Sequence, residues 1–106
     1  MNAERLARLH EFLRETPNDP FTLYAIATEY ATADAAQARV YYEKLLNEHP
    51  DYVATYYHAA KLFLDANEPD LAEATFKKGI AVAQSQNEHL ALRELQNAYN
   101  EFLFDE

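Results

Sequence analysis

A pattern of small and large apolar residues recurs along this chain at a nearly constant step, and this recurrence restricts the possible folds more than any other feature. Leu23, Ile26, Ala27 and Tyr30 return 33 positions later as Tyr56, Ala59, Ala60 and Phe63. Ala38, Tyr42 and Leu46 return 34 positions later as Ala72, Phe76 and Ile80. A repeat of this length indicates one supersecondary unit that is copied and stacked, because a single unit cannot bury its own apolar face. The change from 33 to 34 residues places one additional residue in the turn at 67–70.

The repeated residues lie in segments with helical spacing. Apolar side chains follow one another at three- and four-residue steps. The single Gly and four Pro are too few for the turns of an all-β domain. Breaks at 16–20, 32–34, 49–51, 67–70 and, more weakly, 85–87 therefore predict six helices, over residues 2–15, 20–31, 35–48, 53–66, 70–83 and 88–104. The expected N-caps are Asp34, Asp51 and Asn87.

Small residues recur at the positions where paired helices would cross. They are Ala27, Ala38, Ala60 and Ala72. Small side chains allow two helices to approach at the close end of the range of about 8–10 Å. Gly79 interrupts a predicted helix at a cost of about 1 kcal/mol relative to Ala. We therefore expect the backbone of another helix to approach Gly79 closely.

The order of these residues resembles the tetratricopeptide repeat family. One repeat reads Leu23-x-x-Ile26-Ala27-x-x-Tyr30, then Ala38-x-x-x-Tyr42, and ends at Pro50. The next reads Tyr56-x-x-Ala59-Ala60-x-x-Phe63, then Ala72-x-x-x-Phe76, and Leu92-x-x-Leu95-Gln96-x-x-Tyr99 would begin a third repeat or form a cap. The sequence departs from the family pattern at Gln84, where a terminal Pro is usual, and at Gln96, where a small residue is usual. Because Gln96 is large, we expect the last helix not to receive a further partner helix.

The resemblance implies an all-α fold. Antiparallel helical hairpins would stack as a short right-handed solenoid of about six helices. It also implies a single domain with a half repeat or N-cap at 1–17, repeats at 18–50 and 51–86, and a C-terminal capping helix at 87–106.

Charge and composition restrict the classes of partner. The formal net charge of −9 argues against nucleic acid and against anionic membranes, because both are bound by neutralising phosphates. A solvated acidic surface is the simpler interpretation of this charge, and a basic partner is the alternative. No apolar run is long enough to span a membrane, and the charged residues near the N-terminus differ from a signal peptide. The absence of Cys fits a cytoplasmic protein, which is our expectation.

The sequence contains no set of residues typical of catalysis, metal binding or cofactor binding. The four histidines, His10, His49, His58 and His89, lie in separate segments without a His-x-x-x-His pair. One glycine cannot form a glycine-rich phosphate loop, and the single serine, Ser85, has no recognisable base beside it. We therefore expect no enzymatic activity, no cofactor and no metal.

In the family that this chain resembles, the inner helices line a concave groove that binds peptides. The register places eight residues in such a groove: Phe21, Tyr24, Thr28, Tyr57, His58, Lys61, Arg93 and Asn97. Tyrosine suits peptide capture because it offers a large contact area at a low cost in rotamer entropy. The alternative is that Tyr24 and Tyr57 are partly buried packing residues. Some family members clamp a C-terminal carboxylate with Lys and Asn, but this chain has Tyr24 and Thr28 at the positions required.

Two functions therefore follow from the sequence. The first is a protein–protein interaction module whose groove binds a peptide or helix of a partner protein. The alternative is a structural or self-assembly module, in which Phe102, Leu103 and Phe104 drive homodimerisation or dock on another domain. We expect a monomer or a weak homodimer.

Overall fold

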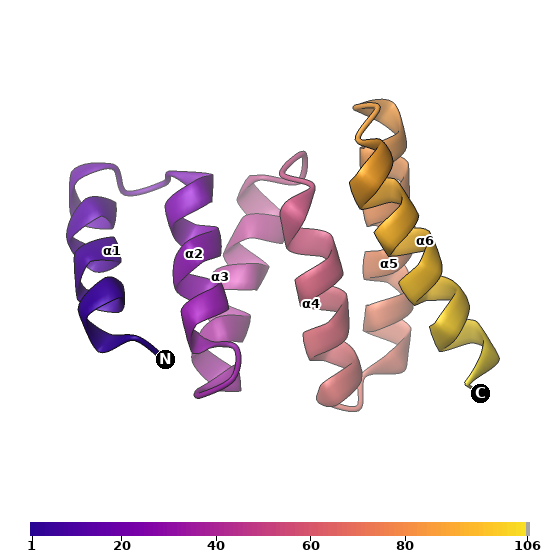
Figure 1. Ribbon diagram of the computed structural model, residues 1–106, viewed down its shortest axis with the longest axis horizontal. Helices are drawn as coiled ribbons and strands as arrows, with labels where there is room; N and C mark the ends of the chain where they lie inside the picture. Colours follow the sequence, from indigo (N-terminus) through magenta and orange to yellow (C-terminus); the bar gives the residue numbers. More distant parts are fainter. Residues whose placement is uncertain (106) are drawn as a thin grey trace. The chain divides into compact units, whose positions relative to one another are not determined.

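The computed structural model describes residues 1–105, and this part of the chain contains six α-helices and no strand (Figure 1). The helices are α1 (Ala3–Glu15), α2 (Pro20–Tyr30), α3 (Ala35–Glu48), α4 (Ala54–Asp65), α5 (Pro69–Ser85) and α6 (His89–Phe104). The predicted all-α class and the six predicted helices are confirmed, with ends that differ by at most two residues. The helices form two compact units, one over Met1–Tyr52 with α1–α3 and one that begins at Val53 and contains α4–α6. The repeat boundaries at 18–50 and 51–86 stay a prediction.

The core of the first unit lies between α2 and α3, which run antiparallel side by side (Figure 1). It consists of Leu23, Ile26, Ala27, Ala38, Tyr42 and Leu45, each at most 1% exposed. Five of them are repeat residues of the sequence pattern, but on α3 it is Leu45 that is fully buried, whereas the repeat residue Leu46 is only partly buried. Tyr30, by contrast, is only partly buried and stacks on Tyr41 of α3, with 6.1 Å between the ring centroids.

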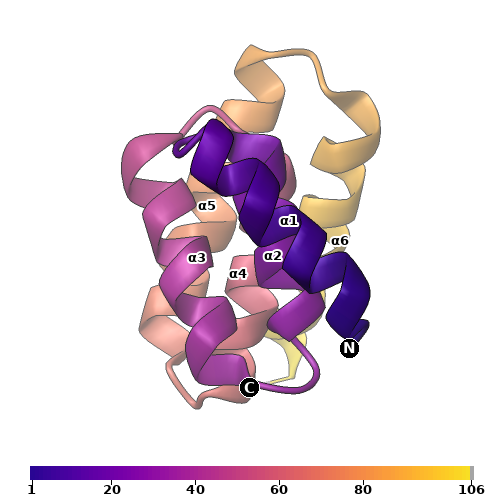
Figure 2. The ribbon, with the colours of Figure 1, turned by 90° about the vertical axis from the view of Figure 1, so that its left-hand side faces the viewer.

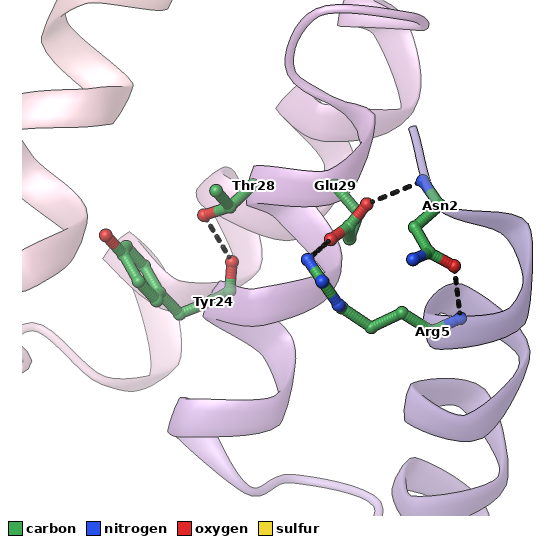
Figure 3. A network of polar contacts seen from close by, with 5 residues as sticks. All are labelled: Asn2, Arg5, Tyr24, Thr28 and Glu29. Carbon is green, nitrogen blue, oxygen red and sulfur yellow. Dashed lines mark hydrogen bonds and ion pairs between the residues drawn. The ribbon is translucent and has the colours of Figure 1, made fainter.

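The helix α1 crosses in front of α2 in Figure 2 and buries none of its own residues. Its His10 ring packs edge-on against Tyr30 and Tyr41. A polar network fixes its N-terminus (Figure 3). The carboxylate of Glu29 on α2 accepts a hydrogen bond of 3.0 Å from the backbone N–H of Asn2 and pairs with the Arg5 guanidinium at 2.7 Å. The Asn2 side chain in turn caps α1 by accepting from the Arg5 N–H at 2.9 Å. Phe12 of α1 is 61% exposed.

The second unit pairs α4 with α5 and adds α6, which packs on both. Its fully buried large side chains are Tyr56, Phe63, Phe76 and Leu95. The ring of Phe76 lies 5.9 Å from that of Tyr99 and 6.2 Å from that of Phe102, measured between centroids. The Tyr99 hydroxyl donates to Glu73 Oε2 at 2.9 Å. Phe102 therefore belongs to the aromatic cluster between α5 and α6.

The small residues stand where helices pack closely, as predicted. The four repeated alanines are 0% exposed. A Cβ added to Gly79 would lie 2.5 Å from Cβ of Tyr56 on α4 and 3.3 Å from Cδ1 of Leu95 on α6. Gly79 is therefore approached closely from both neighbouring helices of its unit, by side-chain atoms and not by the backbone that the sequence analysis expected.

Only one of the three predicted N-caps is correct. The Asp34 side chain accepts from the Gln37 N–H, but α4 begins at Ala54 without a side-chain cap, so Asp51 is not its cap. Asn87 ends a helix instead of beginning one, because its φ of 57° lies in the left-handed region and the next N–H bonds to the Ala83 carbonyl. Asn67 ends α4 in the same way with a φ of 62°. Asparagine tolerates this conformation better than most residues, so it can replace glycine at the end of a helix.

Candidate functional site

Three of the predicted groove residues lie on α2, outside the core of the first unit. Phe21 is 65% exposed, Tyr24 is partly exposed and Thr28 is exposed. In Figure 3 the Tyr24 side chain points away from α1, whereas Glu29 points towards α1. The Thr28 hydroxyl donates to the Tyr24 carbonyl at 2.9 Å, so its proton is used within its own helix. These residues form a face of α2 that is directed away from α1, and Tyr24 and Thr28 lie near the hydroxyl of the buried Tyr42 on α3.

A further aromatic residue, which the sequence did not suggest, lies beside this face. The ring centroid of Tyr52 is 5.8 Å from that of Tyr24, and the two rings are inclined by 56°. Tyr52 is held in the turn after α3, where its N–H bonds to the His49 carbonyl at 3.0 Å. We refer to Phe21, Tyr24 and Tyr52 as the aromatic patch. Helical register did not suggest Tyr52 because it lies in a turn, outside the predicted helices.

A carboxylate lies next to the aromatic patch. Asp19 is the N-cap of α2, and its Oδ2 accepts from the Thr22 hydroxyl at 2.6 Å and from the Thr22 N–H at 2.9 Å. These hydrogen bonds hold the pKa of Asp19 below its usual range, so the side chain is ionised at neutral pH. Burial raises the pKa of the Tyr52 hydroxyl, and the nearby Tyr24 and Asp19 raise it further. Negative charge thus lies within electrostatic reach of Tyr52.

The other five predicted groove residues belong to the second unit. Tyr57, His58 and Lys61 lie on α4, and Arg93 and Asn97 lie on α6. The ammonium group of Lys61 stands 5.8 Å from the centroid of the Tyr57 ring, within the range of a cation–π interaction. Lys61, Arg93 and Asn97 are exposed, whereas Tyr57 and His58 are partly buried. The structure thus distributes the eight residues over two units, and the groove that would join them stays a prediction.

His58 predicts a pH dependence of the stability of the second unit. Burial lowers the pKa of His58 from its usual value of about 6.5, and the Glu94 carboxylate on α6 opposes this only in part. The unfolded chain therefore takes up a proton at a higher pH than the folded chain. We expect the free energy of unfolding to fall as the pH decreases from about 7 to 5, because the stability present above the unfolded pKa is lost on protonation.

Urea unfolding across this pH range measures the effect. His58→Gln should flatten the dependence, whereas His89→Gln, a change at an exposed position, should leave it intact. Equal pH dependence in His58→Gln and wild type would contradict the assignment to His58. The lowered pKa values of Asp19 and Glu29 affect stability only at lower pH, below about 4.5, and do not interfere.

Within residues 1–105, no group of three or more His, Asp or Glu side chains is arranged to hold a metal ion. In the same part of the chain, no helix combines the length and the apolar character needed to cross a membrane.

Paired helices that cross at small residues, repeated along the chain, define a helical-repeat protein. The family model for the tetratricopeptide repeat matches residues 30–95. The chain belongs to the tetratricopeptide repeat family. No curated protein matches the sequence.

Solved structures agree with this assignment. A tetratricopeptide repeat domain protein from Salinibacter ruber, solved by NMR, is 41% identical, with a TM-score of 0.76 over 81% of this chain and 88% of that one. A crystal structure of a tetratricopeptide repeat domain protein from Salinibacter ruber gives 39% identity and a TM-score of 0.80 over 83% of this chain and 100% of that one. A Bordetella parapertussis protein shares the fold at 20% identity, with a TM-score of 0.81 over 99% of this chain and 91% of that one. The tetratricopeptide fold is a general protein–protein interaction module and is generally non-catalytic.

Proposed function

We propose that this chain binds a peptide or a helix of a partner protein, with α2 contributing in the first unit and α4 and α6 in the second. The observation that carries the proposal is the aromatic patch of the first unit. Leu23 and Ile26 fill the core, whereas Phe21 on the same helix is 65% exposed. Large aromatic side chains outside a core are typical of residues that contribute most to binding. A cytoplasmic location is part of the proposal and is compatible with the cysteine-free sequence.

The second unit supports the same proposal with a different chemistry. Lys61, Arg93 and Asn97 are exposed hydrogen-bond donors on α4 and α6, and Tyr57 lies beside Lys61. Aromatic anchors surrounded by adaptable polar groups are characteristic of surfaces that bind polypeptides. The function therefore does not depend on the first unit alone.

Recovery of partner proteins tests the proposal. Immobilised wild type should retain a partner that the double variant Tyr24→Ala/Tyr57→Ala loses, while Phe12→Ala, an exposed aromatic change on α1, should retain it. With the purified partner, we expect the double variant to bind at least about tenfold more weakly, because truncation of each of two anchor residues costs more than about 1 kcal/mol. Unchanged affinity in a double variant that keeps its helical circular dichroism would defeat the proposal.

Self-assembly is the second candidate function, and the C-terminal end of α6 favours it. Phe104 is 88% exposed and Leu103 is 40% exposed. Phe102 takes no part in this surface because it packs on Phe76 and Tyr99. Light scattering of Leu103→Ser/Phe104→Ser therefore tests dimerisation without disturbing the cluster, which a truncation from Phe102 would remove. Wild-type dimers that dissociate in this variant would support self-assembly, and a wild-type monomer at every concentration would exclude it.

A further inference from the structure

The exposed face of α6 carries residues whose order is symmetric about Asn97. Leu90 lies seven positions before Asn97 and Phe104 seven positions after it, and these apolar side chains are 67% and 88% exposed. Arg93 lies four positions before Asn97 and Glu101 four positions after it, and both are exposed. At 3.6 residues per turn, the four side chains lie within about 40° of Asn97 around the helix axis. We refer to these five residues as the α6 stripe.

The α6 stripe lies on the side of the helix that faces away from the core of the second unit. Leu95 and Ala98, which are buried, lie about 100° or more from Asn97 around the helix axis. Within the described residues 1–105, neither Arg93 nor Glu101 belongs to an ion pair. The stripe therefore offers two apolar ends, two opposite charges and a central amide to another molecule.

A second copy of α6 that runs in the opposite direction complements the stripe. In a two-fold interface, wherever one residue meets another, the reverse contact also forms. With Asn97 on the axis, Leu90 of each copy lies level with Phe104 of the other copy, because both are seven residues from Asn97. Arg93 of each copy likewise lies level with Glu101 of the other. The pairing therefore forms two apolar contacts and two contacts between opposite charges.

The same residues favour the antiparallel orientation over a parallel one. A parallel pair in register would place Arg93 against Arg93 and Glu101 against Glu101, and like charges across an interface are costly. In the antiparallel pair, Glu94 lies level with the uncharged Asn100. Asn97 meets Asn97, and a side-chain amide can donate and accept hydrogen bonds at the same time. A polar residue within a helix–helix contact fixes the register at a cost in stability.

We propose that two copies of this chain form a symmetric dimer in which their α6 helices pair antiparallel through the α6 stripe. This inference rests on self-assembly, the second candidate function, and names its surface and geometry. One helix from each copy gives an interface smaller than the standard size, which begins at about 1,200 Å², and the net charge of −9 on each copy opposes association. The dimer is therefore weak. It covers Arg93 and Asn97, which are also candidates for partner binding, so a dimer and a partner bound at α6 exclude each other.

Charge reversal tests the inference by sedimentation equilibrium of the full chain. Arg93→Glu and Glu101→Arg should each raise the dissociation constant of the dimer about fivefold or more, because each places like charges at both Arg93–Glu101 contacts. The two substitutions change the net charge in opposite directions, so a general charge effect would shift the affinity in opposite directions. Arg93→Glu/Glu101→Arg keeps the net charge and restores the opposite charges, so it should dimerise within about twofold of wild type.

The apolar ends of the stripe have a matched control on the same helix. Leu90→Ser and Phe104→Ser should each raise the dissociation constant about fivefold or more, because each apolar contact occurs twice in the dimer. Leu103, which is 40% exposed, lies about 120° from Asn97 around the helix axis. Leu103→Ser should therefore change the dissociation constant less than about twofold. Far-UV circular dichroism checks that each variant keeps its helices.

Disulfide cross-linking tests the orientation, because the chain has no Cys of its own. Asn97→Cys should give a covalent dimer under mild oxidation, since the two Cys meet at the axis and a disulfide needs Cα atoms within about 7 Å. Leu90→Cys should not, because its two copies lie about 21 Å apart along the antiparallel helices. Leu90→Cys/Phe104→Cys should cross-link again.

Three results would overturn the inference. A wild-type chain that stays monomeric up to about 1 mM would exclude both this dimer and self-assembly. Opposite shifts in affinity for Arg93→Glu and Glu101→Arg, or cross-linking of Leu90→Cys as readily as Asn97→Cys, would leave self-assembly intact and place its interface elsewhere. The partner-recovery experiment decides partner binding separately.

Discussion

Replacing Phe76 with alanine should lower the free energy of unfolding by about 3–5 kcal/mol. Phe76 is 0% exposed, and its ring contacts those of Tyr99 and Phe102 on α6. The substitution removes the transfer free energy of a buried ring and leaves a cavity between α5 and α6. Because the Phe76 ring packs directly on two aromatic rings of α6, the loss should appear first as increased hydrogen exchange along α6.

Phe12→Ala is the matched control for Phe76→Ala. It removes the same side chain from a position that is 61% exposed, so urea unfolding should show a loss of less than about 1 kcal/mol. Comparable losses in the two variants would mean that the aromatic cluster does not hold α6 on α5. Retention of helical circular dichroism by Phe76→Ala at low temperature is needed for the comparison.

The fold of this chain could be predicted from its sequence because its residues repeat. Ala27 and Ala60 define the same helix crossing in two repeats, so the sequence contains two independent instances of one packing rule. The residues that cap the helices were predicted less well. Asparagine is common both at N-caps and at left-handed helix ends, and Asn87 is of the second kind. Where a short turn joins two helices, the end of one helix lies next to the N-cap of the following helix, so residue type does not separate the two positions.

The candidate site could be predicted only where it lies on helices. Tyr24 was found because helical register assigns each residue of α2 to a face. Tyr52 was not predicted as a site residue, because its position depends on the turn after α3 and a turn has no periodicity. The exposure of the C-terminal aromatics also depends on packing, since Phe102 is partly buried against Phe76 while its neighbour Phe104 is 88% exposed. Residue type alone does not distinguish them.

Gly79→Ala should lower the free energy of unfolding by about 1–3 kcal/mol, although alanine favours a helix by about 1 kcal/mol over glycine. The new Cβ would lie 2.5 Å from Cβ of Tyr56 and 2.8 Å from its Cγ. Cβ is fixed to the backbone of α4, so a change of rotamer cannot move it away. The helices α4 and α5 would have to separate, and their buried contacts would loosen.

The close approach of Cβ of Tyr56 leads to an additional prediction. A clash with the flexible end of the Tyr56 side chain would not lead to the same result. Tyr56→Ala retains Cβ, so it should not rescue Gly79→Ala, and the double variant should be less stable than either single variant. Ala81→Gly, at an exposed position of α5, should instead cost the helix propensity of about 1 kcal/mol. The first unit has Leu23 and Leu45 at the equivalent positions, both fully buried, so the same fold accommodates two medium side chains there. If Gly79→Ala proves as stable as wild type by urea unfolding, α4 and α5 are not packed as closely as the Tyr56–Gly79 approach requires.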